Sequence, residues 1–152
     1  MKVRDYMQRE PICVTPEMPV PELTALLSKK QITGAPVVDR EGKLQGVVSL
    51  SDVARETAKG SDPELTEYYV NPSWRYVELM EPDPSDKFVG EIMTKLVLDI
   101  EEDAELRAAA ELLTNFRIHR VVVTRDKVVV GVLSTSDLVR AFLDVLKGKV
   151  SV

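Results

Sequence analysis

The stretch GVVSLSD at Gly46–Asp52 occurs again, almost unchanged, as GVLSTSD at Gly131–Asp137. In both copies a glycine and two apolar residues lead to a serine, and an aspartate follows three positions later. Ser-x-x-Asp before an apolar helical pattern predicts a helix start, because each of the two side chains can hydrogen-bond the other residue's backbone amide. One copy would indicate only a helix cap. Two copies in 152 residues indicate a repeated structural unit.

The similarity extends on both sides of this motif. VRDYM at Val3–Met7 matches VGEIM at Val89–Met93, and the DREGK turn of the first copy is shortened to RDK in the second. A turn is where such a change of length is tolerated. We therefore expect a first repeat at residues 1–56, a connector at residues 57–86 and a second repeat at residues 87–152.

Each repeat shows the same order of predicted elements, β-α-β-β-α, which belongs to the α+β class. A unit of about fifty residues has a marginal core, so we expect the two repeats to pack as a pseudo-two-fold pair. The second helix of each repeat should begin at Asp52 or Asp137. The predicted strands are 12–14, 35–38 and one ending at Ser49, then 97–100, 121–124 and one ending at Ser134; the apolar helix faces are Val20, Leu23 and Leu27, then Leu106, Ala109, Leu113 and Phe116.

The predicted last helix, Asp137–Lys147, is apolar on more than one face. A helix of this kind buries one face in its own core and has a second face left for a partner. The pattern therefore favours assembly with another subunit, and a homodimer is the simplest form.

Composition excludes several classes of protein. The chain has 44 % hydrophobic and 30 % charged residues, and its net charge of −5 argues against a nucleic-acid binder. The sequence has no apolar run that could span a membrane, and its first residues, MKVRDYMQREP, lack the apolar core typical of a signal peptide, so we expect a cytoplasmic protein. The single cysteine, Cys13, cannot form an internal disulfide and is interpreted as a buried, inert thiol.

No catalytic arrangement is evident. The chain has one cysteine and one histidine, no phosphate-binding glycine loop and no cluster with metal-ligand spacing. We therefore expect neither an enzyme nor a metal site nor a catalytic cofactor.

The organisation resembles the tandem cystathionine-β-synthase (CBS) domain pair, or Bateman module. The resemblance rests on VRDYM and VGEIM, on ITGAPVVD at residues 32–39 against IHRVVVT at residues 118–124, and on the two Gly-to-Asp motifs. It implies a ligand-sensing module that binds an adenosine-containing nucleotide in clefts between the repeats. AMP, ADP or ATP is favoured over S-adenosylmethionine, because His119–Arg120 offers two adjacent cations to a phosphate.

The resemblance also implies which residues bind the ligand. Asp52 and Asp137 would accept hydrogen bonds from both ribose hydroxyls, and such bonds to a carboxylate are strong. Helix capping is the alternative role of each aspartate. A surface or core position is the alternative for His119. The remaining candidates are Ser49, Ser134, Thr33, His119 and Arg120 for phosphate or ribose, and Val14, Ile32, Ala35, Pro36, Ile100, Ile118 and Val121 for an apolar base slot, for which ordinary core packing is the alternative.

The connector and the two repeats leave two functions open. The connector holds Tyr68, Tyr69, Trp74 and Tyr76, so we expect it to pack on its own domain pair or to bind a partner protein. In the first function, the chain senses an adenosine ligand and regulates a target protein in trans. In the alternative, it is a dimeric scaffold whose nucleotide clefts are vestigial.

Overall fold

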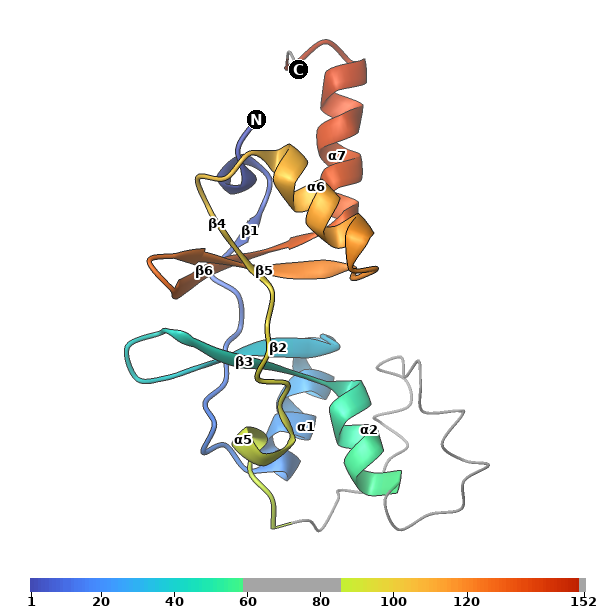
Figure 1. Cartoon of the computed structure of the whole chain (residues 1–152). Coiled ribbons are helices and arrows are strands. Elements are labelled where there is room, and N and C mark those ends of the chain that lie inside the picture. Colours follow the sequence, from blue (N-terminus) through green and yellow to red (C-terminus); the bar gives the residue numbers. More distant parts are fainter. Residues whose placement is uncertain (59–85, 151–152) are drawn as a thin grey trace. The chain divides into compact units, whose positions relative to one another are not determined.

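The computed structural model describes residues 1–58 and 86–150 (Figure 1). The expected docking of the connector's aromatic residues lies outside the described residues. The chain divides into two compact units. Unit 1 contains residues 1–11, 42–44 and, in its described part, 97–150; unit 2 contains residues 12–41, 45–58 and 86–96.

Unit 1 is built on a four-stranded sheet. The strand order is β1-β6-β5-β4, and β4 is parallel to β5, whereas the other neighbouring pairs are antiparallel. The helix α6 connects the two parallel strands, as a parallel crossover requires. The elements are the 3-10 helix η1 (Val3–Asp5), β1 (Gln8–Arg9), β4 (Asp99–Glu101), α6 (Leu106–Asn115), β5 (Arg120–Arg125), β6 (Val128–Ser134) and α7 (Thr135–Leu146).

Unit 2 repeats this order with shorter strands. Its two-stranded sheet, β2-β3, is extended by single bridges, a parallel one from Val14 to Val37 and an antiparallel one from Val47 to Thr94. The predicted strand at residues 12–14 is therefore only the bridge at Val14, and its counterpart in unit 1 is β4. The elements are α1 (Val20–Lys30), β2 (Gly34–Val38), β3 (Leu44–Ser49, with Leu44 counted in unit 1), α2 (Leu50–Ala58) and α5 (Val89–Ile92).

The two units exchange their leading segments. The segment with VRDYM begins the first repeat in sequence, yet its strand β1 pairs with β6 of unit 1. The segment with VGEIM begins the second repeat in sequence, yet α5 and Thr94 belong to unit 2. The compact units therefore do not coincide with residues 1–56 and 87–152.

This exchange explains the glycine of the repeated motif. A Cβ atom built on Gly131 would lie 2.6 Å from Met7 Sδ and 2.9 Å from Gln8 O. One on Gly46 would lie 2.9 Å from Met93 Sδ and 2.7 Å from Thr94 O. Such distances leave no room for a side chain, so glycine lets the backbone of the leading segment approach the strand.

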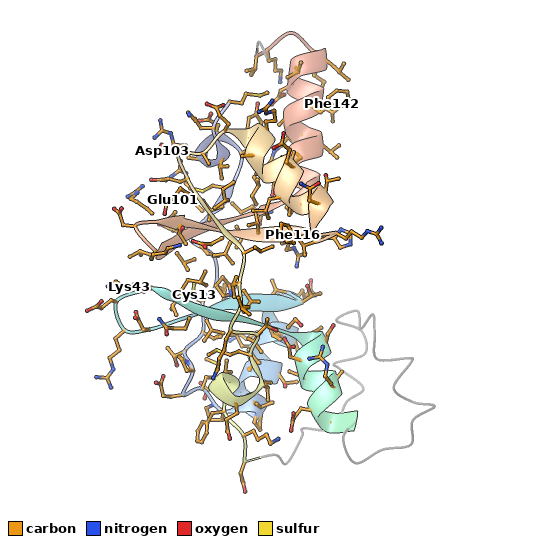
Figure 2. All side chains as sticks on the ribbon, viewed as in Figure 1. Cys13, Lys43, Glu101, Asp103, Phe116 and Phe142 are labelled. Carbon is orange, nitrogen blue, oxygen red and sulfur yellow. The ribbon has the colours of Figure 1, made fainter. Side chains whose placement is uncertain are left out.

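The helix faces follow the predicted pattern with one exception. Val20, Leu23 and Leu27 of α1 are fully buried, and Leu106, Ala109 and Leu113 of α6 are buried. The prediction for Phe116 was wrong, because α6 ends at Asn115 and the Phe116 side chain is 59 % exposed (Figure 2). Phe116 is the C-cap and the following residue, Arg117, has a φ of 52°, so Phe116 lies where the helix ends and its side chain stays outside the core.

The helix α7 carries exposed apolar side chains. Ala141 is buried and Leu138 packs against the core of unit 1. Four residues spaced as one helical stripe are instead turned outward, and Figure 2 shows Phe142 projecting from the helix. The exposed fractions are 58 % for Val139, 61 % for Phe142, 45 % for Leu143 and 66 % for Leu146. Among the described residues, no helix has the length and apolar character needed to cross a membrane.

Candidate functional site

The start of α7 is a complete capping box. Ser134 is the N-cap, and Asp137, at the third helical position, is 3 % exposed. Asp137 Oδ2 accepts hydrogen bonds from Ser134 N at 2.8 Å and from Ser134 Oγ at 2.6 Å. In return, Asp137 N donates to Ser134 Oγ at 3.3 Å. The helix therefore begins at Thr135, not at Asp137 as predicted, because the serine occupies the cap position.

At the start of α2, Asp52 accepts the matching bonds from Ser49. Asp52 is 7 % exposed, and its Oδ2 accepts from Ser49 N at 2.8 Å and from Ser49 Oγ at 3.0 Å. This helix likewise begins earlier than predicted, at Leu50. The capping role of both aspartates is thus present in the structure, and it leaves part of each carboxylate available.

An arginine one turn further along contacts each aspartate. Arg55 Nη1 donates to Asp52 Oδ1 at 3.2 Å, and Arg140 Nη2 donates to Asp137 Oδ1 at 2.6 Å. The sequence reasoning missed both arginines. Their signal was present, because Asp-x-x-Arg occurs at the matching place in both repeats and residues three apart on a helix are neighbours.

The residues just before β2 and β5 form backbone hydrogen bonds with the first residues of α2 and α7. Thr33 O accepts from Leu50 N at 2.9 Å, and His119 O accepts from Thr135 N at 3.0 Å. These bonds satisfy one of the amides that a helix leaves unpaired at its N-terminus. Thr33 is half-buried and His119 is exposed, so both side chains are partly or fully open to solvent.

The two repeats differ at the next position. Arg120 lies opposite Ser134 in the antiparallel β5–β6 pair, so the two side chains share one face of the sheet. Gly34 holds the matching position in unit 2, where an added Cβ would lie 2.8 Å from Val48 O and 3.3 Å from Ser49 Cα. Unit 1 thus places an exposed guanidinium beside its cap, and unit 2 has no space for any side chain there.

The predicted base-slot residues lie at the hydrophobic cores. Val14, Ala35, Pro36 and Val121 are buried. Val14 and Ala35 belong to the core of unit 2 and Val121 to that of unit 1. Ile32, Ile100 and Ile118 are half-buried and pack against those cores, which leaves part of each side chain accessible. The slot itself stays a prediction.

Two further features concern metal binding and the reactivity of the single cysteine. In the described ranges 1–58 and 86–150, no group of three histidine, cysteine, aspartate or glutamate side chains could hold a metal ion. Cys13 is half-buried, and burial raises the pKa of its thiol, which disfavours the reactive thiolate.

The duplicated β-α-β-β-α units and the duplicated Ser–Asp helix starts define a class of protein, a tandem pair of small modules. Comparison with known families then identifies the module. The CBS domain profile matches twice, over residues 3–59 and 89–144, and the chain belongs to the CBS domain family.

Relatives and solved structures agree with this assignment. The chloroplastic CBS domain-containing protein CBSX1 of Arabidopsis thaliana is 33 % identical over 139 residues, which are 87 % of this chain and 59 % of that protein. The chain thus spans less than two thirds of that relative's length.

Two crystal structures of CBS pairs superpose over nearly all of the chain. CBSX2 in complex with AMP has a TM-score of 0.72 and 28 % identity, and the match covers 95 % of this chain and 97 % of that one. The CBS domain pair of protein MJ0100, in complex with 5′-methylthioadenosine and S-adenosyl-L-methionine, has a TM-score of 0.69 and 26 % identity, with coverages of 93 % and 95 %. The predicted α+β pair of repeats is confirmed.

Proposed function

We propose that this chain is a regulatory module that binds an adenosine-containing ligand through Asp52 and Asp137 and catalyses no reaction itself. The observation that carries the proposal is the pair of nearly buried carboxylates at the helix starts. Each belongs to a cap, yet each carboxylate oxygen can accept two hydrogen bonds, and Oδ1 accepts only one within the described residues. The bound ligands of CBSX2 and MJ0100, which all contain adenosine, support this choice of ligand class.

The cap of unit 1 favours a phosphorylated ligand. Arg120 is exposed and shares a sheet face with Ser134, and the preceding residue, His119, accepts from Thr135 N at the start of α7 through its backbone oxygen. A guanidinium suits the planar, bidentate recognition of phosphate. We therefore favour AMP, ADP or ATP over S-adenosylmethionine at this helix start, with Ser134 as a further donor.

The regulatory effect of a bound ligand would reach other proteins through the exposed surface of the module. The stripe formed by Val139, Phe142, Leu143 and Leu146 is mostly exposed, and an apolar stripe of this kind marks a protein contact. We propose that α7 forms a homodimer through this stripe, in the cytoplasm, and that the dimer regulates a target protein in trans according to the bound ligand.

A dimeric scaffold without a ligand is the second candidate. It is favoured by the Ser–Asp contacts, which already satisfy Oδ2 of both aspartates. In that case the exposed stripe on α7 would be the functional surface, and the two motifs would serve only to start helices.

Thermal unfolding with AMP, ATP, S-adenosylmethionine or 5′-methylthioadenosine distinguishes the two candidates. A ligand at about 100 times its dissociation constant should add about 2.7 kcal/mol to the free energy of unfolding. Asp52→Asn and Asp137→Asn should each remove part of that gain, and Asp144→Asn, later in α7, is the control. If none of the four compounds stabilises the wild-type chain and titration calorimetry detects no heat of binding, the scaffold is the correct function.

A further inference from the structure

One side chain connects the helix start of unit 1 to the beginning of the chain. Arg140 Nη2 donates to Asp137 Oδ1 at 2.6 Å and also to the backbone oxygen of Tyr6 at 3.0 Å. We call this chain of contacts the Arg140 bridge, and residues 1–11 the N-terminal segment. A ligand bound to Asp137 would therefore be connected, through the single side chain of Arg140, to the N-terminal segment at the opposite end of the sequence.

The hydrogen bonds of Asp137 show which of its two carboxylate oxygens a ribose hydroxyl can reach. Oδ2 already accepts two donors, from Ser134 N and Ser134 Oγ, whereas Oδ1 accepts one, from Arg140. A hydroxyl can thus bind the second lone pair of Oδ1 while Arg140 stays in place. The other hydroxyl can reach Oδ2 only if Ser134 Oγ turns its proton away, which a hydroxyl rotor does readily.

Among the described residues, unit 2 shows no equivalent bridge. Arg55 Nη1 reaches Asp52 Oδ1 at 3.2 Å, and within the described part of the chain its guanidinium makes no bond to Ile92, the last residue of α5, which matches Tyr6. Within the described residues, Asp52 is therefore not linked through its arginine to the leading segment of unit 2, whereas Asp137 is linked to that of unit 1. A side chain that is already ordered loses less conformational entropy when a ligand binds.

The N-terminal segment is tightly integrated with the sheet that carries Ser134. Gln8 and Arg9 pair with Val132 and Gly131 of β6, and that strand ends at Ser134. In η1, Val3 N donates to Ala104 O at 3.0 Å and Arg4 N donates to Glu102 O at 3.0 Å. A change in the Arg140 bridge would therefore act on a segment that is ordered by many other bonds.

We propose that Arg140 is a positioning residue that makes the Asp137 site the tighter of the two and couples its occupancy to the N-terminal segment. This inference rests on the proposed function, because it assumes that Asp137 binds the ligand. Arg140 fixes the carboxylate in the orientation that a ribose needs. Since coupling between two sites is reciprocal, a ligand on Asp137 strengthens the bond between Arg140 and Tyr6.

The test combines titration calorimetry with hydrogen exchange of the backbone amides of residues 3–9. The full chain carries Asp52→Asn, so that only the Asp137 site binds, and AMP and S-adenosylmethionine are the probes. We expect AMP to slow exchange in this segment. Arg140→Ala should lower the affinity about tenfold and abolish this slowing. Arg140→Lys should recover most of the affinity, because an ammonium still pairs with the carboxylate.

The controls separate this inference from the function on which it rests. Arg107→Ala removes another exposed arginine of unit 1 and should change neither affinity nor exchange. If Arg140→Ala binds AMP as the parent does, with the same slowing of exchange, the positioning role is wrong although the proposed function stands. If neither probe binds the wild-type chain, the proposed function fails and the inference fails with it.

Discussion

Met7 Sδ lies 2.6 Å from the place where Gly131 would carry a Cβ atom. Residue 7 belongs to the first repeat in sequence and residue 131 to the second, yet both lie in unit 1. The same relationship joins Met93 and Gly46 in unit 2, at 2.9 Å. The glycine that opens each motif is therefore a packing requirement for the leading segment of the other repeat.

Gly131→Ala should destabilise the chain by about 1–3 kcal/mol, because the new methyl group forces Met7 or the backbone of Gln8 to move. Urea unfolding measures the change. The control is Gly148→Ala, where the added methyl meets no atom within 4 Å and only the φ of 68° is unfavourable. Equal losses in the two variants would contradict the packing argument.

Ser134→Ala should cost about 1 kcal/mol of stability, because it removes the N-cap oxygen that accepts from Asp137 N and the hydroxyl that donates to Asp137 Oδ2. Ser134→Thr keeps the hydroxyl and should lose much less. Chemical unfolding of the two variants, without any ligand, provides the comparison. If the cap contributes nothing to stability, both variants should unfold with the free energy of the wild type.

The ion pair between Glu102 and Arg125 predicts a pH dependence. Glu102 is 6 % exposed, and the hydrogen bond from Arg125 lowers the pKa of its carboxyl below the ordinary value of 4.5. A lowered folded-state pKa means that the stabilisation is complete above pH 4.5 and is lost as the pH falls through the folded pKa.

The variant Glu102→Gln should therefore be less stable than the wild type at neutral pH, and the difference should shrink in acid. Thermal unfolding at a series of pH values measures it. The control is Glu111→Gln, which removes an exposed pair with Arg107 and should have little effect at any pH. If the difference in stability between the wild type and Glu102→Gln stays constant with pH, the ion pair with Arg125 is not its source.

The exposed stripe on α7 predicts the oligomeric state. Phe142 is 61 % exposed and Leu146 is 66 % exposed, so Phe142→Asp and Leu146→Asp should shift the proposed homodimer to monomer without unfolding it. Light scattering coupled to size exclusion measures the mass. Phe116→Asp changes an exposed aromatic side chain outside α7 and is the control. A wild-type chain that is monomeric at high concentration would refute the proposed dimer.

Local patterns predicted much of this fold because they depend on residues close in sequence. The repeat, the helix faces of α1 and α6 and the turn at Asp126–Lys127 are all of this kind; both residues of that turn have positive φ, as a type I′ hairpin turn requires. The pattern failed for Phe116, where the helix ended one residue earlier than the apolar spacing indicated.

The exchange of leading segments could not be predicted in the same way. A strand as short as Gln8–Arg9 carries no signal for the sheet that it joins, because pairing depends on contacts distant in sequence. The role of Arg140 was hidden for a similar reason, since its contact with Tyr6 joins residues at opposite ends of the chain. The ligand-binding role of Asp52 and Asp137 stays a prediction.

The interleaving of the two units bears on how such a chain could have arisen. In a single ancestral repeat, the leading segment would not have packed on the strand of its own molecule. A second molecule would have had to supply the leading segment for that strand. Duplication and fusion of the gene would then have turned an association between two molecules into an arrangement within one. For the same reason, either half expressed alone should complete its sheet only by associating with a second molecule, whereas the two halves produced together should restore each other.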